Sequence, residues 1–298
     1  MVRRQDDTDG RRTRAAGSGN TAGPAPRIIV ALLPEPETVA TCLNCALAAA
    51  DGFDAAISAI HVGFNPKFAF VPPEEIAIQQ LRELREGTIA ARLARTKAVF
   101  DAWIAGRAGA PVTWKHDEGD VGALVAAETA DADLVVMGNP VRLDGRDAFH
   151  ATLFWSKRLL LVAPPDPRTG PRPARTVGRH IVVGWKPGEP VKRAARQALP
   201  WLARAGKVTV VSVEKPGAES YQTSARAFFA ELGIAVDCVE LRREAGSVGQ
   251  QLLAAADRLG ADSLLIGAFK HGALWEAILG GVTRDVLAAA HIPVFMMC

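Results

Sequence analysis

The chain has 298 residues, with 35 Lys and Arg against 32 Asp and Glu, and a formal net charge of +3. At roughly 100–200 residues per domain, this length predicts two domains. Its content of 49% hydrophobic and 22% charged residues excludes a wholly disordered chain, a collagen-like repeat and a small disulfide scaffold. No apolar stretch approaches the roughly 18–20 residues that cross a bilayer, so we expect a cytoplasmic protein with no membrane partner.

Residues 1–26 contain almost no side chain that could be buried, and we expect them to form a disordered, basic tail. Cys42 and Cys45 have the CxxC spacing of metal and redox sites, but no His is nearby and the segment has a helical pattern. We therefore interpret both as small apolar core residues and expect no metal. Aromatic residues are not interleaved with basic ones, so a nucleic-acid partner is not expected either.

The strongest organisational feature is an internal repeat. Short, continuous apolar runs, typical of parallel strands buried on both faces, alternate with amphipathic helical patterns. The fourth runs match most plainly, since DADLVVMG at 131–138 corresponds to GADSLLIG at 260–267. The expected strands are 27–33, 55–62, 111–115, 131–138 and 159–162 in the first half, and 180–185, 208–213, 234–241, 260–267 and 293–297 in the second.

Three helical segments have recognisable features. The segment from Pro73 to about Gly106 predicts one long or broken helix, and Ser247 with Gln250 has the spacing of a capping box. A last helix is expected from Gly281 or Val282 to about Ala290. Its inward-facing residues are predicted to be Val282, Val286 and Ala289.

Two halves that each alternate five strands with helices predict an α/β protein with two tandem open parallel sheets and flanking helices. The predicted parts are a tail (1–26), a first domain (27–163), a linker (164–178) and a second domain (179–298). Ligands bind beyond the carboxyl ends of the strands in such sheets. We therefore expect a site at the turns after the first and fourth strands of a half.

The turn that begins at Gly267 is rich in glycine and leads into the last predicted helix. Unpaired N–H groups and the partial positive charge at a helix N-terminus are suited to hold phosphate. The alternative is a turn whose glycines only permit positive φ angles. The sequence alone leaves both interpretations open.

The segment from Gly267 to Met297 resembles the closing segment of the universal stress protein (UspA-like) family. That family's pattern is Gly, two residues, Gly, nine residues, Gly, then Ser or Thr, followed by a helix and a final Pro-Val strand. In this chain, GGVTRDVL at 280–287 and IPV at 292–294 are similar to family members. The repeated layout resembles the tandem members of the family.

The resemblance implies an adenine nucleotide alpha hydrolase-like fold with strand order 3-2-1-4-5. It also implies pairing of the two domains through their last strands, and it leaves a homodimer open. In nucleotide-binding members, an Asp after the first strand contacts the nucleotide, the Gly-rich turn wraps the phosphates and the final Ser or Thr bonds them. The implied partner is therefore an adenine nucleotide, with ATP and magnesium as the candidate cofactors.

The second half departs from this pattern at three positions. Trp185 to Gly188 follow the first strand without an acidic residue, Lys270 replaces the second Gly, and Gly281 replaces the Ser or Thr, with Thr283 expected to face elsewhere. Trp185 could stack on an adenine or fill its space. The candidate nucleotide-binding residues are Trp185, Lys186, Gly188, Gly267, Ala268, Lys270, His271, Gly272, Gly280, Gly281 and Val282.

The first half is interpreted as a degenerate copy that pairs with the second. Glu35, the acidic residue after its first strand, has a Pro on each side. After its fourth strand, no Gly-Gly or Gly-Ser pair precedes the next helix. Residues 150–155 occupy that place.

Catalytic motifs such as the phosphate-binding loop, the nucleophile elbow and the HExxH zinc motif are absent from the sequence. We therefore expect a non-catalytic stress-response protein with a modified, nucleotide-binding pocket in the second domain. One alternative is a nucleotide-independent protein-interaction module whose pocket is filled by Lys270 and Trp185. A weaker alternative is a slow ATPase.

Overall fold

The computed structural model describes residues 24–65, 73–107, 109–165, 176–215, 217, 219–268 and 281–298. Within these ranges, none of the helices combines the length and the apolar character that crossing a membrane requires.

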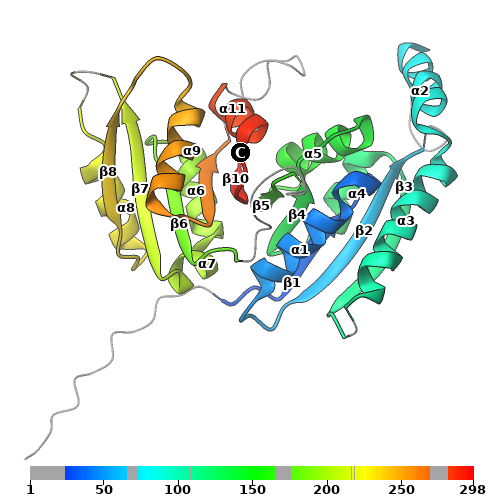
Figure 1. Cartoon of the computed structure of the whole chain (residues 1–298), viewed down its shortest axis with the longest axis horizontal. Helices are drawn as coiled ribbons and strands as arrows, with labels where there is room; N and C mark the ends of the chain where they lie inside the picture. The colour runs from blue at the N-terminus through cyan, green and yellow to red at the C-terminus, as the bar shows by residue number, and fades with distance from the viewer. Residues whose placement is uncertain are drawn as a thin grey trace, which may run out of the picture.

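The described strands form one sheet of ten, in the order β3-β2-β1-β4-β5-β10-β9-β6-β7-β8 (Figure 1). Each half contributes a parallel block with the order 3-2-1-4-5, as the family resemblance implied. The strands are β1 (Ile28–Leu32), β2 (Ala56–Phe64), β3 (Val112–Gly119), β4 (Leu134–Gly138), β5 (Leu160–Ala163), β6 (His180–Gly184), β7 (Lys207–Glu214), β8 (Asp237–Arg242), β9 (Ser263–Gly267) and β10 (Val294–Met297).

The two blocks join at their last strands, because β10 pairs antiparallel with β5 and places Phe295 opposite Leu161. Both strands are fully buried. The indole N–H of Trp201 adds a contact across the halves by donating to the carbonyl of Ala49 at 2.9 Å. The expected pairing of the halves through their last strands is therefore present, and it produces one continuous sheet.

Helices cover both faces of the sheet, because alternate residues of each strand face opposite cores. Ile29 and Ala31 contribute to one core, which α1, α3, α6, α7 and α8 cover. Val30 and Leu32 contribute to the other, which α4, α5, α9 and α11 cover. The helices are η1 (Pro36–Thr38), α1 (Val39–Ala50), α2 (Pro73–Glu86), α3 (Ile89–Ala105), α4 (Val121–Glu128), α5 (Leu143–Trp155), α6 (Glu189–Gln197), α7 (Leu199–Arg204), α8 (Gln222–Glu231), α9 (Val248–Leu259) and α11 (Gly281–Ala289).

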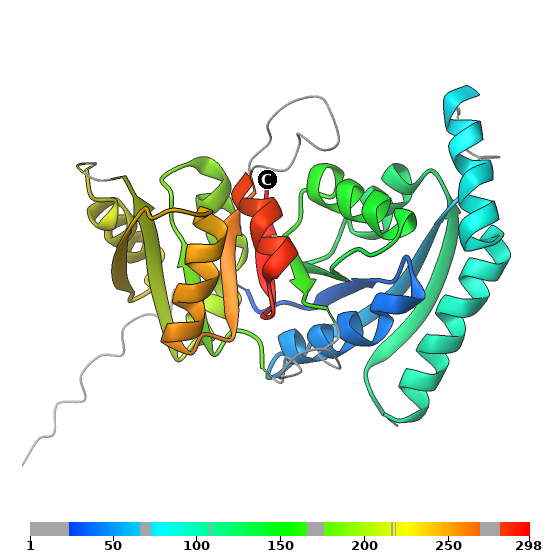
Figure 2. The ribbon, with the colours of Figure 1, turned by 45° about the horizontal axis from the view of Figure 1, so that its top comes forward.

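Several local predictions are confirmed. The long segment after Pro73 is a broken helix, and Figure 2 shows α2 extending beyond the end of α3 at the outer edge of the first half. Ser247 and Gln250 form the predicted capping box at the start of α9. Cys42 and Cys45 are buried inside α1, as expected of core residues.

Three boundaries or faces differ from the prediction. α5 begins at Leu143, well before His150, and β8 begins at Asp237 rather than at Ile234. α11 has the predicted extent, but Thr283, Val286 and Leu287 are its buried residues, while Ala289 is exposed. The packing of α11 against α9 selects this face, since a Cβ on Gly249 of α9 would lie 2.9 Å from the carbonyl oxygen of Val282.

Candidate functional site

A cavity of about 560 Å³ lies at the carboxyl ends of β6, β7 and β9 in the second half. This is the edge of an open α/β sheet where ligands bind. Its volume is within the range of about 300–1,000 Å³ that is usual for pockets holding cofactors and other small molecules.

One wall of the cavity is apolar. It is formed by side chains that belong to a single core between the sheet and α9. Such a surface suits the flat ring of a base or another apolar group, because burying that ring removes apolar area from water. The residues of this wall are Val211, Val213, Val248, Leu252 and Ile266.

Three basic residues, Lys186, Lys215 and Arg243, also line the cavity. They come from the turns after β6, β7 and β8, so three separate strand ends bring their positive charge to one place. Cationic side chains gathered in a partly enclosed cavity attract anionic ligands. The cavity therefore combines an apolar wall with cationic residues.

The N-terminus of α11 reaches the same cavity through Gly281, Val282 and Thr283. We expected Thr283 to face elsewhere, but its side chain is buried and lines the cavity, because α11 is rotated from the predicted face. A Cβ on Gly281 would have no atom of the described residues within 4 Å. The helix start thus offers backbone N–H groups and one hydroxyl.

The structure brings Trp185, Lys186, Gly267, Gly281 and Val282 of the candidate set together around the cavity. Gly188 is instead the N-cap of α6, and Ala268 is a core residue whose N–H donates to the carbonyl of Met297 at 2.8 Å. Neither of these two is among the residues that line the cavity. The remaining candidates, Lys270, His271, Gly272 and Gly280, lie outside the described residues.

Trp185 forms part of the cavity wall and also part of the core. Its side chain is only 3% exposed, and its ring packs on Phe228 and Phe229 with centroid distances of 5.3 and 5.6 Å. The indole N–H donates to the hydroxyl of Ser224 at 3.3 Å. The ring is thus held by α8 on one side while the residue borders the cavity on the other.

Glu214, which the sequence analysis did not single out, is the acidic residue of the cavity. It is the last residue of β7, and an acidic residue directly after a buried apolar run was the available signal. The family pattern has an acidic side chain after the first strand, whereas the structure supplies one from the second strand of this half.

The equivalent place in the first half is occupied by the chain itself. The two carboxylate oxygens of Glu35 accept hydrogen bonds from the backbone N–H groups of Val141 at 2.8 Å and Arg142 at 2.7 Å, at the start of α5. Glu35 is 2% exposed, and burial raises its pKa although the two N–H bonds act in the opposite direction. A helix N-terminus that would suit an external anion thus holds an internal carboxylate.

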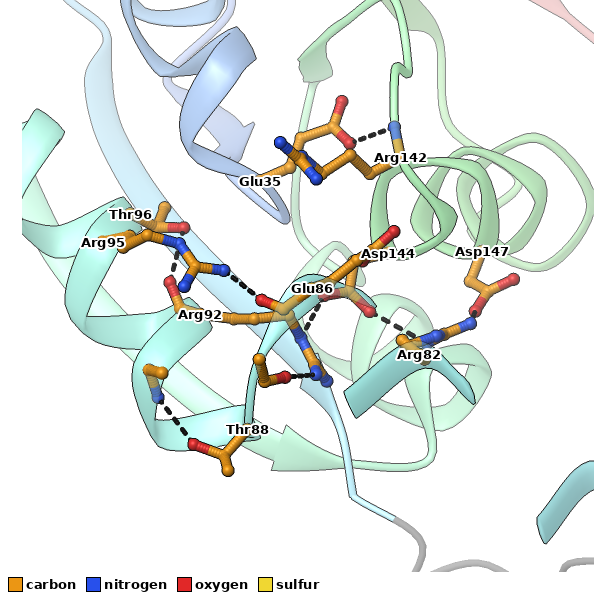
Figure 3. Close-up of polar contacts among 12 residues, drawn as sticks. Glu35, Arg82, Glu86, Thr88, Arg92, Arg95, Thr96, Arg142, Asp144 and Asp147 are labelled. Atoms are coloured by element: carbon orange, nitrogen blue, oxygen red, sulfur yellow. Dashed lines mark hydrogen bonds and ion pairs between the residues drawn. The ribbon is translucent and has the colours of Figure 1, made fainter. Parts of the chain in front are cut away.

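A buried ion-pair network closes the same region of the first half (Figure 3). Asp144 of α5 accepts from Arg82 of α2 at 2.9 Å and from Arg92 of α3 at 2.7 Å, and Arg82 also contacts Asp147 at 2.6 Å. The side chains of Asp144 and of both arginines are at most 6% exposed. This network ties α2 and α3 to α5.

The connections before α5 and α11 also differ. Residues 139–142 join β4 to α5, whereas residues 268–280 join β9 to α11. The first half therefore has only a short connection at the place where the second half has a long one.

Comparisons with known proteins agree with this architecture. A universal stress protein from Archaeoglobus fulgidus DSM 4304 matches with a TM-score of 0.58 and 14% identity, over 91% of this chain and 95% of its own. A functionally unknown protein from Pseudomonas aeruginosa PAO1 matches with a TM-score of 0.52 and 16% identity, over 92% of both chains. A putative universal stress protein from Pseudomonas aeruginosa UCBPP-PA14 gives 0.51 and 17%, over 92% and 93%.

These three structures show that both halves share the fold, because each match spans nearly the whole chain. None of the curated proteins matches the chain. The model of the universal stress protein family matches residues 178–297, which include β6 to β10 and the cavity. Residues 178–297 are therefore a domain of the universal stress protein family, preceded by a first half with the same strand order.

Proposed function

We propose that the second half binds a nucleotide, with ATP and magnesium as the candidate pair, and that the protein acts as a non-catalytic stress-response module. The observation that carries this proposal is the cavity of about 560 Å³ at the carboxyl ends of β6, β7 and β9. It combines an apolar wall, three basic residues and a helix N-terminus. A nucleotide offers the matching parts, namely an apolar ring and a chain of phosphates.

Each part of the cavity has a role in this proposal. The wall that includes Val211 and Leu252 receives the base, and Lys215 and Arg243 attract the phosphates. The N–H groups at Gly281 and the hydroxyl of Thr283 are suited to a phosphate oxygen, since anions bind favourably at helix N-termini.

The first half takes the role of a scaffold in the same proposal. Its α5 N-terminus already binds the carboxylate of Glu35, and the ion pairs of Asp144 hold two helices over it. An external phosphate would have to displace a carboxylate that is covalently part of the chain. We therefore propose one nucleotide per chain.

The test is calorimetric titration of the full chain with ATP, with and without magnesium, together with thermal unfolding at millimolar ATP. A ligand that binds only the folded state raises the unfolding midpoint. Arg243→Ser should weaken ATP binding by about tenfold, because charge-assisted hydrogen bonds to phosphate are strong. Its matched control is Arg242→Ser, the preceding exposed residue that does not line the cavity, and this change should leave affinity unaltered.

Absence of heat and of any midpoint shift at millimolar ATP would reject the proposal. A stoichiometry of two would reject the scaffold role of the first half. Release of inorganic phosphate, measured on the same samples, should stay at the level of a protein-free control. Steady release above that level would support the alternative that the protein is a slow ATPase.

A further inference from the structure

We propose that Glu214 determines which ligands the cavity accepts, by receiving a hydrogen bond from a neutral N–H or O–H donor of the ligand. This inference rests on the proposed function and adds a second requirement to it. The ligand must carry a donor group in addition to its anionic end.

The geometry of Glu214 leaves one carboxylate oxygen without a partner. Oε1 accepts from the hydroxyl of Ser212 at 2.8 Å and from the backbone N–H of Tyr221 at 2.9 Å, which fixes the side chain. Oε2 is fully buried, and none of the described residues donates a hydrogen bond to it. Glu214 as a whole is 4% exposed, yet it is one of the residues that line the cavity.

A buried carboxylate oxygen without a donor is unfavourable, because it has lost its hydrogen bonds to water and gained none from the protein. The contacts of Oε1 prevent the side chain from turning out to solvent, since that would break both. A ligand that brings an N–H or O–H group to Oε2 therefore satisfies an atom to which none of the described residues donates. A ligand without such a group gives Oε2 no hydrogen bond.

The neighbouring charges narrow the ligand class further. Lys215 directly follows Glu214, and Arg243 lines the same cavity, so an anionic group is also favoured there. A nucleoside phosphate has both features, and two of its parts supply neutral donors. These are the ribose hydroxyls and the exocyclic amine of adenine, which the experiment below distinguishes.

Calorimetric titration of the full chain with magnesium and ATP, dideoxy-ATP or inosine triphosphate tests this role. Dideoxy-ATP lacks both ribose hydroxyls, and inosine triphosphate lacks the exocyclic amine. We expect one of the two analogues to bind about ten- to a hundredfold more weakly than ATP, because discrimination against a missing donor leaves a charged group unpaired. The weaker analogue identifies the donor.

Glu214→Gln is the matching variant, because its amide oxygen can keep the contacts of Oε1 while an NH₂ group replaces the accepting Oε2. It should bind ATP about tenfold or more weakly and lose the discrimination between ATP and the weaker analogue. Glu240→Gln on β8 is the control, since this carboxylate binds Ser220 and does not line the cavity. The unfolding midpoint without ligand shows whether each variant is folded.

Two results overturn the inference and can be told apart. If the wild-type chain binds all three nucleotides equally, or if folded Glu214→Gln binds ATP like wild type, Glu214 has no such role while the cavity remains a nucleotide site. If the wild-type chain binds none of them, the proposed function fails and this inference with it. Should Glu214→Gln not fold, the comparison of the three nucleotides on the wild-type chain still decides.

Discussion

The carboxylate of Glu35 accepts a hydrogen bond from the backbone N–H of Arg142 at 2.7 Å, and this contact closes the first half's counterpart of the cavity. The other carboxylate oxygen binds the N–H of Val141. The N-terminus of α5 is thus occupied by a side chain of the protein itself, whereas a Cβ on Gly281 at the N-terminus of α11 would have no described atom within 4 Å. The contrast between the halves is accessible to experiment.

Replacing Glu35 should both destabilise the protein and create an anion site. Glu35→Ala removes the carboxylate that accepts from the N–H groups of Val141 and Arg142, and it should lower the free energy of unfolding by about 2–4 kcal/mol, as judged from hydrogen bonds to charged groups. Inorganic phosphate or sulfate should then raise the unfolding midpoint of the variant more than that of wild type. Urea titrations with and without phosphate measure both effects.

Glu37→Ala is the matched control for this change. Glu37 is a partly exposed neighbour that pairs with the side chain of Arg142, so its loss should cost less than about 1 kcal/mol. If phosphate raised the unfolding midpoints of wild type and Glu35→Ala equally, this would argue against an anion site at the start of α5.

The buried ion pairs of Asp144 should be worth far more than an exposed pair. Asp144→Ala leaves the guanidinium groups of Arg82 and Arg92 without this partner, and we expect a loss of about 3–5 kcal/mol in unfolding free energy. The exposed pair of Lys97 and Asp101 on α3 offers a comparison, and Asp101→Ala should cost no more than about 0.5 kcal/mol. Similar losses for the two variants, measured by urea unfolding, would contradict the structural role assigned to Asp144.

His61 should make stability depend on pH. Burial lowers the pKa of His61 below 6.5, although its Nδ1 contact with the carbonyl of Leu33 acts in the opposite direction. The unfolded chain therefore takes up this proton first as the pH falls. The stability contributed by neutral His61 is complete above pH 6.5 and decreases between 6.5 and the lower pKa of the folded state.

His61→Asn should therefore flatten the loss of unfolding free energy between about pH 8 and about pH 5. His116→Asn on the neighbouring strand is the control, since His116 is exposed and pairs in register with His61. If His61→Asn left the pH profile unchanged while His116→Asn altered it, the pH dependence would belong to His116 and the prediction for His61 would be wrong.

Two glycines at the cavity should differ in how much stability the same substitution costs. A Cβ on Gly267 would lie 2.5 Å from the backbone nitrogen of Val191 and 2.9 Å from the backbone carbon of Pro190, so neither atom can move cheaply. Gly267→Ala should therefore cost about 1–3 kcal/mol. The added methyl group of Gly281→Ala meets no atom of the described residues within 4 Å, and this change should alter stability by less than about 0.5 kcal/mol. Thermal unfolding of the two variants tests this contrast, and equal midpoints would show that β9 can separate from α6.

Much of the fold was accessible from the sequence because its signals are local. Continuous apolar runs such as Leu134–Gly138 are typical of strands buried on both faces, and Ser247 with Gln250 form a cap within four residues. The strand order followed from the family resemblance rather than from these patterns. The antiparallel pairing of β5 with β10 was likewise expected from that resemblance.

The candidate site was harder to predict from the sequence, because it depends on how segments far apart in the chain meet in the fold. Glu214 contributes to the cavity from the end of β7, and no spacing along the chain relates it to Gly281 or Arg243. The face of α11 was misassigned because both Val282 and Thr283 fit a helical pattern, and contact with α9 decides between them. The contact of Glu35 with Val141 joins residues that are 106 positions apart.

The position of β10 has a consequence for how the molecule is made. Val294–Met297 follows all the other described strands along the chain, yet it lies in the middle of the sheet between β5 and β9. Until these residues emerge, the apolar edges of two nearly finished blocks stay open, and open strand edges can pair with other chains. A chain that lacked β10 would therefore lose the pairing between its two blocks, whereas loss of an outer strand such as β3 or β8 would leave that pairing in place.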